Sequence, residues 1–95
     1  MAQQQRDLLI IGKAIRAVRE QHDLSAGDLA AAAGVAETQI LALESGQLDP
    51  DFELLLTLAE SIGVRPSAFI LRAEELSDRD DAAQPPSPNA SASNS

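Results

Sequence analysis

The sequence predicts an all-α fold: a compact five-helix domain followed by a disordered C-terminal tail. Apolar residues recur at three- and four-residue spacing in five successive segments, which is the period of an α-helix. Hydrophobic residues make up 44% of the 95-residue chain, yet only two residues are aromatic, and the abundant Ala and Leu are good helix formers. Glycine, proline and capping residues separate the segments by short loops, which is typical of a small helical domain.

The first two helices are predicted over residues 7–21 and 26–33, with the polar residues 1–6 frayed. The apolar stripe of the first helix consists of Leu8, Ile11, Ile15 and Val18. Ser25 and Asp28 form an S-x-x-D capping box, so the second helix starts just after Ser25. Gly34 supplies the positive-φ residue that ends this helix and begins a tight turn.

Three further helices complete the domain. The third runs over about residues 36–45, with Ile40 and Leu43 toward the core, and Gly46 ends it. Asp51 caps the fourth helix, which Gly63 stops. The fifth is short, from Pro66 to near Arg72, and at least one residue of the run Phe69-Ile70-Leu71 should face outward, toward a partner or the first helix. The domain therefore spans residues 7–72, and the Asp-, Pro- and Ser-rich residues 77–95 are expected to be disordered.

Composition excludes several classes of function. The chain has no cysteine and a single histidine, His22, so disulfides, thiolate metal sites and multi-histidine sites are excluded. We expect no metal and no cofactor. The carboxylates are spread over exposed helix positions and no phosphate-binding glycine loop is present, so an enzyme is not expected. No apolar run approaches the ~20 residues that span a bilayer, which favours a cytoplasmic protein with no membrane partner.

The segments fit a composite motif: I-x-x-x-R, L-S-x-x-x-L-A, A-x-x-x-G-V, I-x-x-x-E-x-G, then P and L-x-x-L-A-x-x-[LI]-G-V, all within residues 11–69. At these residues the chain resembles the lambda-repressor-like, XRE/Cro-type helix-turn-helix family. The resemblance implies a homodimeric transcriptional regulator that binds a double-stranded DNA operator, with the third helix as recognition helix in the major groove.

The resemblance also implies roles for individual residues. Arg19 and Glu44 match an ion pair between the first and third helices. The base-facing positions of the third helix are occupied by Glu37, Thr38, Gln39 and Ala42. The candidate phosphate contacts are Lys13, Arg16, Arg19, Ser25, Ser45 and Gln47, with Arg19 structural in the first place. Two positions depart from the family: Ala26 stands where a phosphate-binding Gln is usual, and Ala36 offers no side-chain cap.

The charge favours an alternative hypothesis. The net charge is −8, and residues 34–55 contain five carboxylates and no Lys or Arg. Such a surface repels phosphates, whose attraction provides most non-specific DNA affinity. The alternative is a degenerate helix-turn-helix module, antirepressor- or antitoxin-like, whose acidic face docks a basic protein partner.

Overall fold

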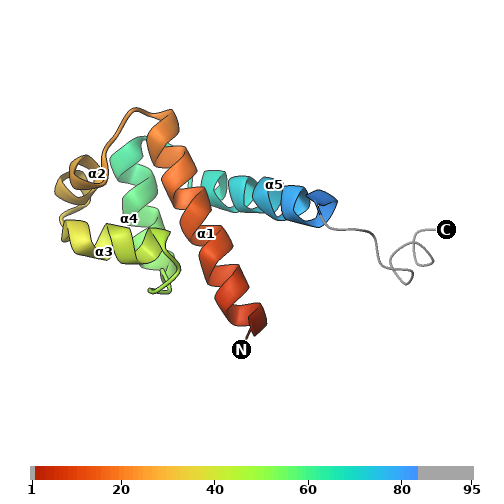
Figure 1. The fold of residues 1–95 in the computed structure, drawn as a ribbon. Helices are drawn as coiled ribbons and strands as arrows, with labels where there is room; N and C mark the ends of the chain where they lie inside the picture. Colours follow the sequence, from red (N-terminus) through yellow and green to blue (C-terminus); the bar gives the residue numbers. More distant parts are fainter. Residues whose placement is uncertain (1, 84–95) are drawn as a thin grey trace, which may run out of the picture.

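A computed structural model describes residues 2–83 of the chain, and the side chains of residues 6–78. It contains the helices α1 (Ala2–Gln21), α2 (Ala26–Ala33), α3 (Glu37–Glu44), α4 (Phe52–Ile62) and α5 (Ser67–Ala83), and residues 2–83 contain no strand. Figure 1 shows α2, α3 and α4 gathered on one side of α1, with α5 extending away on the other. The predicted all-α, five-helix fold is confirmed.

Local capping interactions fix both ends of α2 and of α4 where the sequence predicts them. The N–H of Asp28 donates to Ser25 Oγ over 3.0 Å, and the N–H of Ser25 donates to Asp28 Oδ2 over 3.1 Å. Asp51 Oδ1 accepts from the N–H of Leu54 at the start of α4. Gly34 and Gly63 adopt φ of 73° and 93° directly after α2 and α4, a conformation that costs glycine little.

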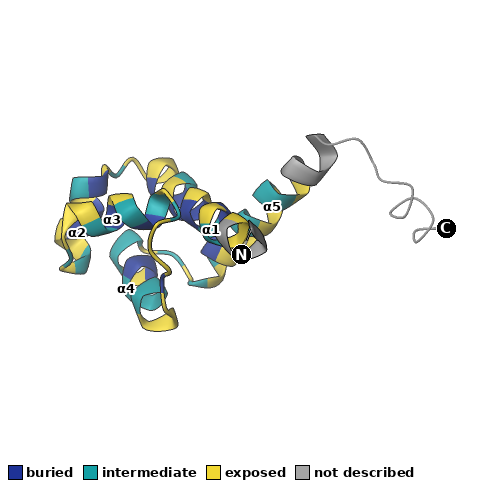
Figure 2. Ribbon diagram, turned by 60° about the horizontal axis from the view of Figure 1, so that its bottom comes forward, coloured by how far each residue is buried: buried dark blue, intermediate teal, exposed yellow. Residues whose placement is uncertain are grey.

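One core joins all five helices, and it is visible as the buried segments of Figure 2. Its largest fully buried side chains are Ile15, Leu29, Ile40, Leu43, Leu58 and Phe69. Val35, Leu54, Leu55, Ile62 and Val64 pack against this cluster from its edge. The burial of Ile40 and Leu43 seats α3 between α1 and α2, which leaves the opposite side of α3 toward solvent.

The crossing of α1 over α3 is closer than side chains normally permit. A Cβ added at Gly12 would lie 2.3 Å from the carbonyl oxygen of Leu43 and 2.8 Å from that of Glu44. Beyond the end of α3, a Cβ at Gly46 would lie 3.1 Å from the Cα of Leu9. Backbone therefore meets backbone along this contact, and Gly12 is required by the packing of α3.

The first and last helices are longer than predicted. Residues 2–6 are helical rather than frayed, because they contain good helix formers and neither Gly nor Pro before the apolar stripe. The predicted end of the fifth helix near Arg72 is also wrong, since α5 continues to Ala83. α1 and α5 are in contact, and Ile70, Ala73 and Ser77 line one hollow with Ile10 and Ile11 of α1, so the added turns up to Ser77 lie beside α1. The predicted disorder is therefore wrong for residues 77–83, and residues 84–95 lie outside the described residues.

Within the described part of the chain, no single helix is long and apolar enough to cross a membrane. The segments Phe52–Ile62 and Ser67–Asp78 are long and apolar enough for a membrane span only when they are taken together. They are bent by 100° relative to each other.

Candidate nucleic-acid interface

The α2–turn–α3 unit is held by hydrogen bonds close in sequence. The N–H of Val35 donates to the carbonyl of Ala30, closing the turn after α2. Ala36 has the extended conformation of an N-cap but supplies no side-chain bond to α3, as its residue type predicts. The start of α3 therefore lacks a side-chain cap, and its position depends on the core contacts of Ile40 and Leu43.

The four residues predicted to face bases are not packed away. Glu37 and Thr38 are exposed, whereas Gln39 and Ala42 are half-buried. With Ile40 and Leu43 inward, the 100° step of an α-helix places Thr38 and Ser45 farthest from the core, with Leu41 and Ala42 on either side of them. Gln39 and Glu37 lie on the two flanks of that surface.

Leu41 is the residue of this surface that the sequence prediction missed. Its side chain is 50% exposed on α3. The same 100° step would have found it. It turns residue 41 away from both Ile40 and Leu43 and places it about one turn after Thr38. An apolar residue ordinarily favours burial, so residue type alone gives no sign that position 41 is exposed.

The predicted pair of Arg19 and Glu44 is present and buried. Arg19 Nε donates to Glu44 Oε2 over 2.7 Å, Nη2 donates to Oε1 over 2.9 Å, and Nη1 donates to the carbonyl of Leu24 over 2.8 Å. Hydrogen bonding to Glu44 raises the pKa of Arg19 above its ordinary value, against the lowering effect of burial. Arg19 thus joins α1, α3 and the segment before α2.

The same geometry limits what Arg19 can offer a phosphate, for which it was predicted to be a contact only in the second place. All three guanidinium nitrogens of Arg19 are engaged within the chain, and the residue is only 8% exposed. The remaining two N–H groups of the guanidinium lie in a largely buried site, where a phosphate has little access to them. Arg19 is therefore a structural residue.

The other predicted phosphate contacts are accessible, but several are already engaged. Arg16 Nε donates to Glu20 Oε2 over 3.1 Å, an exposed pair that water can replace. Ser25 Oγ caps α2, and Ser45 Oγ donates to the carbonyl of Ala42. The last two predicted phosphate contacts, Lys13 and Gln47, are exposed side chains.

Acidic groups dominate the surroundings of α3. A Cβ at Gly27 would lie 3.7 Å from the carboxyl atoms of Glu37, so this carboxylate sits beside the first turn of α2. The positive end of the α2 dipole favours an anion there, and the carboxylate of Glu37 supplies one from within the chain. Past the end of α3, the exposed Asp49, Asp51 and Glu53 flank Phe52, which is 69% exposed.

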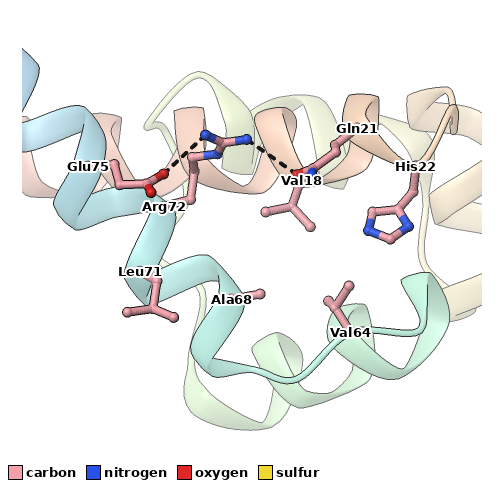
Figure 3. A pocket seen from close by; sticks show the side chains of 8 residues that line it. All are labelled: Val18, Gln21, His22, Val64, Ala68, Leu71, Arg72 and Glu75. Carbon is pink, nitrogen blue, oxygen red and sulfur yellow. Dashed lines mark hydrogen bonds and ion pairs between the residues drawn. The ribbon is translucent and has the colours of Figure 1, made fainter.

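A hollow of about 410 Å³ lies elsewhere, between the end of α1 and the first part of α5 (Figure 3). Its lining includes Val18, Val64 and Leu71, with no residue from α2 or α3. The guanidinium of Arg72 already donates to Glu75 over 3.1 Å and to Gln21 over 3.3 Å. This hollow is therefore separate from the α3 surface. No group of three His, Cys, Asp or Glu side chains able to hold a metal occurs in the described part of the chain.

The helix-turn-helix family model HTH_3 matches residues 15–69, more than half of the chain. Among solved structures, the clp gene regulator ClgR from C. glutamicum superposes with a TM-score of 0.70 at 23% identity, covering 73% of this chain and 90% of ClgR. The restriction-modification controller protein C.AhdI from Aeromonas hydrophila superposes with a TM-score of 0.65 at 26% identity, covering 67% of this chain and 97% of C.AhdI. Comparison with curated proteins gives no match.

Proposed function

The chain belongs to the helix-turn-helix family described by HTH_3, and we propose that it is a sequence-specific DNA-binding transcriptional regulator with α3 as its recognition helix. One observation carries the proposal: α3 is seated by Ile40, Leu43 and the Arg19–Glu44 pair, while its opposite side is open to solvent. A rigid helix with a free outward side is what major-groove docking requires.

The proposal assigns base contacts to Glu37, Thr38, Gln39 and Ala42. Gln39 can pair with adenine, and Glu37 can accept from the amino group of cytosine. Lys13, Arg16 and backbone N–H groups would supply the phosphate contacts, since the residues from 34 to 55 contain no cation. Binding should therefore depend more on base recognition than on charge.

Duplexes selected from a random library provide the test, with affinity measured by fluorescence anisotropy at several salt concentrations. We expect a salt slope equivalent to about two or three phosphates per subunit, because the surface offers few cations. Thr38→Ala should weaken binding, whereas the control Thr57→Ala in α4 should not. A slope equivalent to six or more phosphates contradicts this account of the surface.

We also propose a homodimer. Leu71 is 59% exposed on α5, next to the half-exposed Ile70, and α5 stands away from α2, α3 and α4 (Figure 1). Pairing of Leu71 with a second copy would remove this side chain from water. Sedimentation at high micromolar concentration should give a dimer mass, and Leu71→Asp should give the monomer. The matched change Phe52→Asp should leave the dimer intact, and a monomeric wild type contradicts the proposal.

One observation favours a second candidate function, a protein-interaction module. Phe52 is the most exposed large apolar side chain of the described residues, and it is flanked in sequence by three carboxylates, with no Lys or Arg between residues 34 and 55. A basic partner segment with an apolar anchor would complement this surface. If wild type binds no duplex while Glu37→Lys or Asp49→Lys creates DNA affinity, and a single basic protein is captured, this candidate replaces the first.

A further inference from the structure

We propose that Leu41 is a specificity-determining residue which, together with Ala42 and the methyl group of Thr38, recognises the 5-methyl groups of thymines in the operator. The inference rests on the proposed function and names the base chemistry that α3 reads. Neither the resemblance nor the comparisons assign a role to Leu41.

Leu41 is the one large apolar side chain that α3 exposes. Leu41 exposes half of its surface. Thr38, which carries a methyl group, lies three residues before Leu41 and four before Ala42, so the three side chains are neighbours on the helix. The hydroxyl of Ser45 is already bonded to the carbonyl of Ala42. Glu37 and Gln39 flank this surface and keep the base contacts assigned to them above.

Thymine is the base that matches this chemistry. In the major groove it presents a methyl group, whereas the other three bases present only hydrogen-bonding groups, and apolar side chains distinguish it by contact. An exposed leucine gains free energy when a methyl covers it, and that gain does not require any cation. Because residues 34–55 contain no Lys or Arg, apolar contacts would carry an unusual share of the specificity.

The experiment replaces each thymine of a selected operator with deoxyuridine, one at a time, which removes only the 5-methyl group. For the full-length wild-type chain we expect a loss of affinity of about fourfold at one or two positions, as burial of one methyl group predicts. Leu41→Ala should bind the thymine operator more weakly and show no thymine-to-uracil difference at one of those positions. Leu9→Ala removes an exposed leucine from α1 that has no part in either proposed interface, and it should keep the wild-type difference.

The outcomes separate the two proposals. Absence of binding to every duplex overturns the proposed function. Binding without any thymine-to-uracil effect, or an unchanged effect in Leu41→Ala, overturns the role of Leu41 and leaves the proposed function standing. If Leu41→Ala abolishes binding, Leu41→Val must show a smaller thymine-to-uracil ratio than wild type, and an equal ratio overturns the inference. Because Leu41 is half exposed, its truncation leaves no buried cavity, and circular dichroism verifies the fold.

Discussion

Removal of Glu44 from its pair with Arg19 is the sharpest test of how α3 is held. In Glu44→Ala the guanidinium of Arg19 loses two of its three hydrogen bonds, both shorter than 3.0 Å, and keeps only the one to Leu24. Side-chain exposures of 10% and 7% leave little room for water to replace them. We expect a loss of about 3–5 kcal/mol in the free energy of unfolding, the typical result of leaving a buried charge unpaired.

The assay is urea and thermal unfolding followed by circular dichroism at 222 nm. For a domain of this size each kcal/mol lowers Tm by about 4–8 °C, so Tm should fall by at least about 12 °C. Glu20→Ala is the matched control, since Glu20 pairs with Arg16 of the same helix and both side chains are exposed, Arg16 by 62% and Glu20 by 54%. Such an exposed pair contributes well under ~1 kcal/mol.

Equal losses in Glu44→Ala and Glu20→Ala would refute the argument that burial makes this pair essential. A second variant remains informative if Glu44→Ala does not fold. Replacing both partners, Arg19→Met with Glu44→Leu, removes the unpaired charge and should recover most of the lost stability, because well-packed apolar pairs often replace buried ion pairs without cost. A double variant as unstable as Glu44→Ala would show that the charges themselves are required.

Two further predictions concern the positions around α2 and α3. Gly12→Ala should destabilise the fold by about 1–3 kcal/mol or more in urea unfolding, because its methyl meets the carbonyls of Leu43 and Glu44. Gly27→Ala is the control within a helix and should be neutral or stabilising, since only the flexible side chain of Glu37 lies as close as 3.7 Å to the added Cβ. A smaller loss of stability in Gly12→Ala than in Gly27→Ala would contradict the close crossing of α1 and α3. The N–H and hydroxyl of Ser25 hold the pKa of Asp28 below its usual 3.8. The capping box therefore stabilises the fold above pH 3.8, and this stabilisation is lost as the pH falls through the lowered pKa. Urea midpoints at pH 7 and pH 3 should therefore differ less in Asp28→Asn than in wild type, and an equal difference would argue against the box.

Several features of this protein follow from the sequence because they depend on neighbours within about four residues. The capping box of Ser25, the cap of Asp51 and the turns at Gly34 and Gly63 involve only local hydrogen bonds and local backbone conformation. The burial of Ile40 and Leu43 follows equally from helical period. These signals were sufficient to predict five helices and the α2–turn–α3 unit.

The tertiary structure decided what depends on residues far apart in the chain. Only the crossing of α1 over α3 explains why Gly12 has no side chain, and only the burial of the Arg19–Glu44 pair removes Arg19 from the surface available to phosphate. Packing against α1 carries α5 past the point where its composition predicted an end. The exposure of Leu41 also depends on which elements cover α3. Local hydrogen bonds determine where a helix begins and ends, whereas the side chains that remain free for a partner depend on how the helices exclude water from one another.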